Sequence, residues 1–222
     1  MEDLTTSLYV IVITSIVIIT LFAIIKYSKS KKAEKIIQLA AAKGWEYTLI
    51  REPLSWGYRL DTQRWGFESI AQSISAASDE KSSNIVHATR WFGKNRTKEE
   101  RFVLLIGPRP KNNLSGDLNQ SLIQMAVSMH LGEHVSEIRE ISVASSKLFD
   151  QYLVLSNNDR LTTDLLSPPM QRALMQWPGN VLPLIKVLNN EISIEIKDVK
   201  LEKPEEIESI IFMGETLLSG FR

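Results

Sequence analysis

The chain has 222 residues, no cysteine, and 26 Lys and Arg side chains against 26 Asp and Glu. Without cysteine it can form no disulfide bond, no Cys-ligated zinc or iron–sulfur centre and no thiolate nucleophile. The balanced charge gives no electrostatic basis for wrapping nucleic acid, which requires clustered positive charge, so we expect no nucleic-acid partner.

The chain begins with an uncharged segment of 22 residues, 4–25, which reads LTTSLYVIVITSIVIITLFAII. As a helix this segment would reach about 33 Å, enough for a hydrocarbon core of about 30 Å. Only a helix would satisfy its backbone hydrogen bonds in lipid. The sequence therefore predicts a transmembrane helix at 4–25, preceded by residues 1–3 outside the cytoplasm.

A cleaved signal peptide is the alternative interpretation of this segment. It would need a basic N-terminal region and small residues at a cleavage site. Glu2 and Asp3 are acidic instead, and large apolar residues surround Ala23 at the end of the segment. We therefore expect the segment to be retained as an anchor.

A basic juxtamembrane segment, residues 26–35, follows the uncharged segment and reads KYSKSKKAEK. Positively charged flanks stay in the cytoplasm. We therefore expect a single-pass protein of the inner (plasma) membrane, with its N-terminus out and its soluble domain in the cytoplasm. The lysines could also contact anionic lipid headgroups.

The first half of the domain, which we place at residues 36–222, gives a mixed pattern. A helix is predicted at 33–43, continuing from the anchor and capped by Gly44. A strand is predicted at 45–50, whereas residues 51–83 give no readable pattern. Two strands, at 85–91 and 101–106, flank a charged turn that suits a hairpin.

The second half is easier to assign. We predict a helix at 117–131, strands at 140–144 and 151–156, and a helix that begins at Pro168 and Pro169. A hairpin is predicted from strands at 184–188 and 191–197. In its second strand, Ile alternates with polar residues, so we expect one face to be buried and the other exposed to solvent.

A final helix follows Pro204, with Glu205 and Glu206 in its first turn, where the helix dipole favours acidic residues. Its apolar residues recur at helical spacing, at Ile207, Ile210, Ile211, Leu217, Leu218 and Phe221. Because consecutive elements usually pack together, we expect this helix to lie across the inner face of the preceding hairpin. The whole pattern predicts an α+β fold: a transmembrane helix, then one soluble domain with a mostly antiparallel sheet covered by helices.

Three short segments and one longer one carry a resemblance: Lys43–Tyr47 (KGWEY), Phe149–Tyr152 (FDQY), Ser167–Met170 (SPPM), and the hairpin and helix at 184–221. With them the chain resembles uncharacterised bacterial proteins that have a single membrane anchor and a soluble α+β domain. The resemblance implies this architecture and brings no activity with it.

The segment His130-Leu131-Gly132-Glu133-His134 has the order H-x-x-E-H. On a helix, His130 and His134 would share a face and could bind one zinc ion, with Glu133 as the base. Gly132, however, lies where the preceding amphipathic helix should end. We therefore predict no catalytic, cofactor-binding or metal residue, and keep these three as candidates for an alternative zinc site.

Two other patterns carry less chemistry. Residues 78–81 match S-x-x-K, but the partner motifs of that enzyme class are missing from the sequence. Arg64-Trp65 and Arg90-Trp91 could form a stacking surface for a single strand or a protein, although core packing suits a neutral domain better.

The sequence thus predicts a membrane-tethered cytoplasmic interaction or scaffold module without catalytic activity and without a cofactor. Its expected partners are the lipid bilayer and a protein or membrane complex. One alternative is a membrane-bound zinc hydrolase that uses residues 130–134. The other is a domain that binds lipid or a small ligand.

Overall fold

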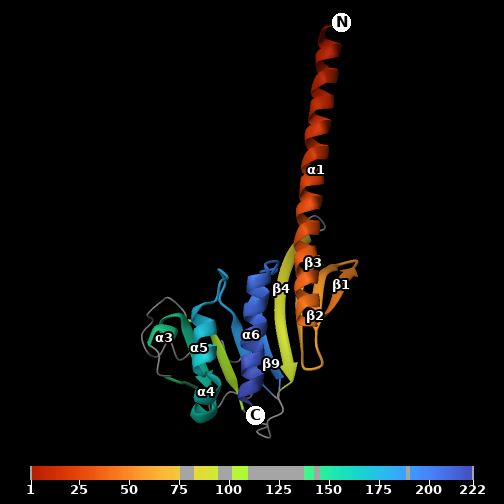
Figure 1. The fold of residues 1–222 in the computed structure, drawn as a ribbon. Helices are drawn as coiled ribbons and strands as arrows, with labels where there is room; N and C mark the ends of the chain where they lie inside the picture. The colour runs from red at the N-terminus through yellow and green to blue at the C-terminus, as the bar shows by residue number, and fades with distance from the viewer. Residues whose placement is uncertain are drawn as a thin grey trace, which may run out of the picture.

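The computed structural model describes residues 2–75, 83–94, 102–109, 138–142, 146–188 and 191–221, and in the first helix the side chains from Ile13 on, except at residues 25, 28 and 29. The described part of the chain is an α+β fold built on a nine-stranded antiparallel sheet (Figure 1). The strand order is β1-β2-β3-β4-β9-β8-β5-β7-β6. The predicted α+β class with an antiparallel sheet is confirmed.

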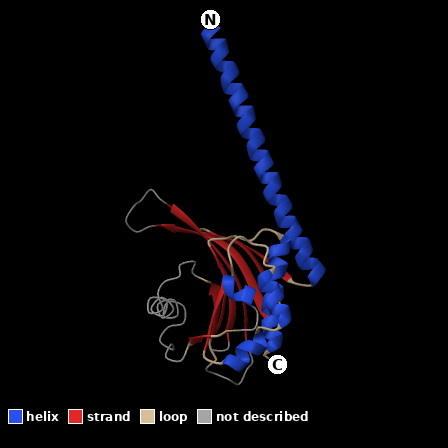
Figure 2. Cartoon of the chain, turned by 90° about the vertical axis from the view of Figure 1, so that its left-hand side faces the viewer, coloured by secondary structure: helices blue, strands red, loops and turns tan. Residues whose placement is uncertain are grey.

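Helix α1, Glu2–Lys43, is one continuous helix of 42 residues. Gly44 ends it with a φ of 70°, a left-handed conformation that glycine adopts without strain, as the sequence predicts. The N-terminal part of α1 projects from the domain, while Ile36 and Ala40 near its other end are buried in the core (Figure 1, Figure 2).

Within the described residues, no helix is both long enough and apolar enough to cross a membrane. The transmembrane assignment of residues 4–25 stays a prediction.

Four strands, β1 (Glu46–Glu52), β2 (Ser55–Asp61), β3 (Trp65–Ser75) and β4 (Ser83–Lys94), follow one another as an antiparallel meander. Strands β2 and β3 occupy the region that gives no readable pattern in the sequence. Gly57 and Gly66 interrupt the apolar–polar alternation of these strands. Each must be glycine because neighbouring atoms leave no room for a Cβ. A Cβ on Gly57 would lie 2.8 Å from the Cα of Ile70, and one on Gly66 would lie 2.5 Å from the ring of Phe92.

The other five strands are β5 (Leu104–Pro108), β6 (Arg139–Glu140), β7 (Tyr152–Ser156), β8 (Leu184–Leu188) and β9 (Glu191–Lys197). The predicted pairing of the strands at 85–91 and 101–106 is wrong, because β4 pairs with β3 and β9, whereas β5 pairs with β7 and β8. Residues Leu104, Leu105 and Ile106 are all buried, so β5 suits a place inside the sheet between two partners. Of the strand predicted at 140–144, Glu140 lies in β6, residues 141–142 are not in a strand, and residues 143–144 lie outside the described residues.

The described helices after α1 are α3 (Ser146–Gln151), α4 (Asp159–Leu165), α5 (Pro168–Met175) and α6 (Pro204–Gly220). The helix predicted at 117–131 lies outside the described residues. Helix α6 contacts β4 and β9, and its Ile210 and Leu217 are buried in one cluster with Ile192 and Ile194. The predicted packing of the last helix on the hairpin is confirmed. Helices α1, α5 and α6 lie on the same side of the sheet (Figure 2).

Candidate functional site

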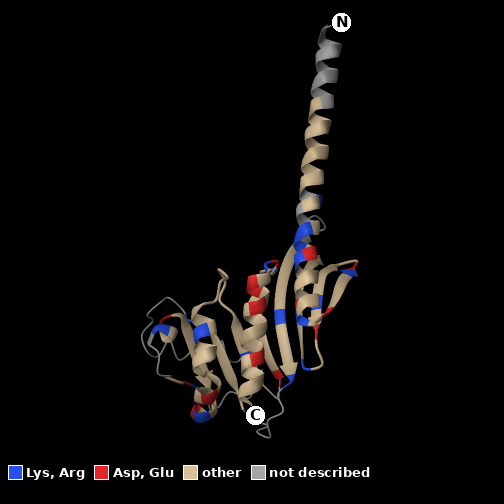
Figure 3. Ribbon diagram, in the orientation of Figure 1, with Lys and Arg blue, Asp and Glu red and all other residues tan. Residues whose placement is uncertain are grey.

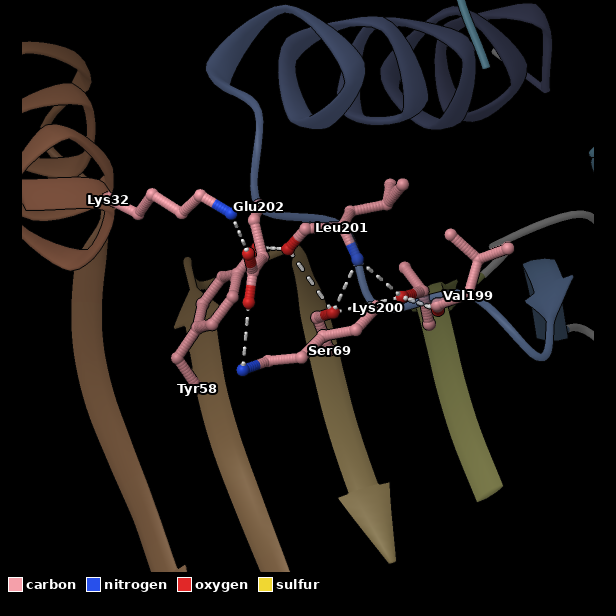
Figure 4. Close-up of polar contacts among 8 residues, drawn as sticks. Lys32, Tyr58, Ser69, Val199, Lys200, Leu201 and Glu202 are labelled. Atoms are coloured by element: carbon pink, nitrogen blue, oxygen red, sulfur yellow. Dashed lines mark hydrogen bonds and ion pairs between the residues drawn. The ribbon is translucent and has the colours of Figure 1, made fainter. Parts of the chain in front are cut away.

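The connection between β9 and α6, residues 198–203, crosses the helix-covered face of β2, β3 and β4 as a strap (Figure 4). It begins at Asp198, which has a φ of 58° and turns the chain out of β9. The strap matters because it also meets α1, so it joins the projecting helix to the sheet.

Three hydroxyl groups, one on each strand, hold the strap. The Thr89 hydroxyl donates to the carbonyl oxygen of Val199 at 2.8 Å. The Ser69 hydroxyl accepts from the backbone N–H of Leu201 at 3.0 Å, and the Tyr58 hydroxyl donates to the carbonyl oxygen of Leu201 at 2.7 Å. These groups are buried, and a buried polar group without a partner costs about 1–3 kcal/mol, so the three bonds fix the course of the strap.

Burial raises the pKa of the Tyr58 hydroxyl far above its usual value. Tyr58 therefore keeps its proton and acts as a donor to the strap, not as a base.

Glu202, near the end of the strap, forms ion pairs with two lysines. Lys32 of α1 donates to its carboxylate at 2.8 Å, and Lys200 lies 3.3 Å from it. Burial alone would raise the pKa of Glu202, but the hydrogen bonds and charges of Lys32 and Lys200 outweigh it and hold that pKa below its usual value. The carboxylate is therefore ionised at neutral pH and pairs with Lys32 of α1.

A second ion pair joins α1 to α6, between Lys43 and Glu208 at 2.8 Å. Both ion pairs are half-exposed, so each contributes at most about 1 kcal/mol. Ile36 adds more, since burying such a side chain contributes about 1.5–3 kcal/mol. Together these contacts fix the C-terminal part of α1 on the domain and set the direction in which the rest of the helix projects.

A surface groove of about 600 Å³ lies between α5 and α6. Its lining comprises Pro169, Arg172, Ala173, Gln176, Glu208, Ser209 and Phe212. Phe212 is 51% exposed, although it lies in the middle of a helix, and Arg172 supplies a charge beside it. Exposed aromatic and Arg side chains are typical of protein-binding surfaces.

The described residues contain no group of three or more His, Cys, Asp or Glu side chains that could hold a metal ion. The candidates His130, Glu133 and His134 lie outside the described residues, as does the S-x-x-K segment at 78–81. The hydroxyls of Tyr58, Ser69 and Thr89 serve the strap. What the described geometry can do is hold a helix on a domain and offer a groove beside it.

Trp65 and Trp91 pack in the core, whereas Trp56 is exposed. Trp65 donates from its indole N–H to Glu215 at 3.0 Å and contacts Trp45 and Trp91 by ring edges or tilted faces. Trp91 is fully buried beneath Gly214 of α6. The preferred prediction, core packing in place of a stacking surface, is confirmed for Trp65 and Trp91.

Sequence reasoning did not find the residues that bind the strap. Tyr58 shares a strand face with Leu60, and Ser69 shares one with Phe67 and Ala71, so strand periodicity is a usable signal. Their hydrogen-bond partner lies more than 100 residues further along the chain, and no local pattern reveals such a pairing.

No protein-family model matches the sequence, and no curated protein matches it. Among solved structures, the crystal structure of the mycobacterial trehalose monomycolate transport factor A, TtfA, is similar at a TM-score of 0.43 and 9% sequence identity. The superposition covers 83% of this chain and 91% of that chain.

Proposed function

We propose that this chain is a membrane-tethered interaction module. Residues 4–25 of α1 span the bilayer, and the strap and the two ion pairs hold the domain close beneath it. The proposal is supported above all by the apolar side chains of α1 that face solvent on every side of the helix. Their exposed fractions run from 50% at Val17 to 72% at Phe22, and the set is Ile13, Ile16, Val17, Ile18, Ile19, Leu21, Phe22 and Ile24. A helix that is apolar all round is stable in lipid or inside a protein, not in water.

The orientation in this proposal has the N-terminus out and the domain in the cytoplasm, at the inner membrane. Its support is the distribution of charge, since lysines crowd the domain side of the uncharged segment while Glu2 and Asp3 precede it. Tyr27 is exposed beside this flank, with the ammonium of Lys31 5.7 Å from its ring centroid. An aromatic side chain beside lysines suits the headgroup region.

The partner of the domain is a protein or a membrane complex that docks in the groove between α5 and α6. The exposed Phe212 and the charges of Arg172 and Glu208 support this part of the proposal. Since Glu208 also pairs with Lys43, a partner in the groove would lie next to the C-terminal end of α1.

Membrane extraction tests the anchor. Replacing Ile16 and Ile19 by Arg places two charges in the middle of the segment, at about 2.5–3.5 kcal/mol each for insertion. The wild-type chain should stay in the pellet after alkaline carbonate treatment, and the double Arg variant should move to the supernatant. Gln63→Arg, in an exposed turn of the domain, is the matched control and should stay in the pellet. A wild-type chain that carbonate extracts completely would overturn the proposal.

A further inference from the structure

Four large apolar side chains near one end of the sheet are exposed: Leu54, Trp56, Ile74 and Ile85. We call this set the apolar rim. Leu54 lies in the turn between β1 and β2, and Ile74 and Ile85 lie toward the adjoining ends of β3 and β4. Strand register brings these ends together, since Trp56 pairs with Ala71 and the N–H of Ser73 donates to the carbonyl oxygen of Leu54. Exposed apolar side chains gathered at one place mark an interaction surface.

The apolar rim lies at the end of the domain from which α1 projects. Figure 1 and Figure 2 both show the β3–β4 end directed toward the same side as the N-terminal part of α1. The opposite end of the sheet carries the turn between β2 and β3, with exposed Gln63 and Arg64.

The level that the apolar rim reaches can be worked out from the register. The pair Ser73–Ile85 lies four residues beyond the pair Ser69–Thr89, which is about 13 Å along the strands. The strap crosses Ser69 and Thr89, and its Glu202 meets Lys32 of α1. Figure 1 and Figure 3 show the described ends of β3 and β4 at the level of the basic residues of α1, on the domain side of the uncharged segment.

We propose that the apolar rim is a second membrane contact, which inserts into the headgroup region of the bilayer that α1 spans. This inference rests on the proposed anchoring of α1 and adds to it a defined contact and orientation of the domain. The bilayer is the occupant because the apolar rim lies at the level of the basic flank of α1, where an anchored helix would pass through the headgroup region. Amphipathic surfaces of this kind bury their apolar side chains about 5–10 Å into the boundary between headgroups and acyl chains.

The charges beside the apolar rim fit the same occupant. Figure 3 shows Lys and Arg gathered on α1 where it leaves the domain. The lysines of this flank with described side chains are Lys26, Lys31, Lys32 and Lys35. Each Lys near an anionic leaflet adds attraction to the surface. An apolar rim beside a basic flank is the pattern of a protein surface that lies against anionic lipid.

Single-cysteine labelling tests the contact, because the natural chain has no cysteine. An environment-sensitive NBD label is attached to the full chain at Leu54→Cys or Ile85→Cys, in vesicles of phosphatidylethanolamine and phosphatidylglycerol. Ile16→Cys reports insertion of α1, and Gln63→Cys is the control at the far end of the sheet. The quencher is a lipid with a nitroxide close to its headgroup. The labels at Leu54 and Ile85 should emit at shorter wavelength than the label at Gln63 and should lose intensity with the quencher.

A further variant separates apolar insertion from mere closeness to the bilayer. With Leu54→Asp and Ile74→Asp in place, the label at Ile85→Cys should lose its blue shift and its quenching, while the label at Ile16→Cys keeps both. Labels at Leu54 and Ile85 that behave like Gln63, with Ile16→Cys still in lipid, would overturn this inference and leave the anchor standing. An Ile85→Cys signal unchanged by the two Asp residues would also overturn it. A label at Ile16 that meets no lipid would refute the anchor itself.

Discussion

Replacing Gly214 by Ala tests how α6 lies on the sheet. Gly214 is in the interior of α6, where Ala usually stabilises a helix by about 1 kcal/mol. A Cβ at this position, however, would lie 2.5 Å from Cζ2 of Trp91 and closer still to Cδ2 and Cε2. Ordinary contacts between carbon atoms are about 3.5–4.0 Å, so the overlap is about 1 Å or more.

The ring of Trp91 has little room to move away. Trp91 is fully buried, and its Cη2 lies 2.9 Å from the position that a Cβ on Gly93 would take. Trp65 packs on it at 6.4 Å between ring centroids. Overpacking a core costs about 1–3 kcal/mol, and a ring confined on two sides belongs at the upper end of that range. After the gain in helix propensity, Gly214→Ala should destabilise the domain by about 2 kcal/mol.

Thermal unfolding of the full chain in detergent checks this value. For a domain of this size, 2 kcal/mol corresponds to a fall in Tm of about 4–8 °C. Ser219→Ala, at an exposed position of the same helix, is the control and should leave Tm nearly unchanged. A Gly214→Ala variant as stable as the wild type, or more stable, would mean that α6 does not press on Trp91.

Three further predictions concern the core and the strap. Leu217→Ala empties a fully buried site on α6 and should cost about 2–5 kcal/mol in urea unfolding, whereas a loss below about 1 kcal/mol would contradict the packing. Tyr58→Phe leaves the buried carbonyl of Leu201 with only a 3.4 Å contact to a serine hydroxyl, so the same assay should show a loss of about 1–3 kcal/mol. Glu202→Gln should lower Tm at neutral pH. Because the folded-state pKa of Glu202 lies below its usual value of 4.5, its stabilisation is present above that value and is lost as the pH falls through the lower pKa. The Tm difference between Glu202→Gln and the wild type should therefore shrink at acidic pH, and a constant difference would refute the ionised contact.

The parts of the fold that the sequence predicts are those with a strong local pattern. The strands at 184–188 and 191–197 begin and end as expected, because Ile192, Ile194 and Ile196 alternate with polar residues. The last helix begins at Pro204, where proline and two acidic residues favour a helix start. These signals lie within a few residues of the structure that they specify.

The missed strands β2 and β3 show where local patterns fail. Glycines interrupt the apolar alternation of these strands. They are needed because atoms of another strand approach too closely to admit a Cβ. Ser69 is a polar residue at a core position, and its partner is the backbone of Leu201 in the strap. Sequence periodicity cannot show that a buried hydroxyl is satisfied by a distant backbone group. The pairing of β4 with β9, in place of β5, is equally non-local.

The candidate site was predictable only in part. The lysines after the uncharged segment were recognised as a basic flank, but the pairing of Lys32 with Glu202 follows from the course of the strap. The groove between α5 and α6 combines residues of two helices that are more than 25 positions apart, so it emerges only from the packing.

The side of the membrane on which the domain lies decides whether residues 4–25 tether it in the cytoplasm. Spheroplasts and inverted inner-membrane vesicles that contain the full chain, with an epitope after Arg222, are treated with protease. If residues 4–25 span the membrane and the domain is cytoplasmic, the epitope survives in spheroplasts and is lost in inverted vesicles, where a fragment containing residues 4–25 remains in the membrane. Loss of the epitope in intact spheroplasts, or recovery of the whole chain in the fraction without membranes, would refute the tethered cytoplasmic domain.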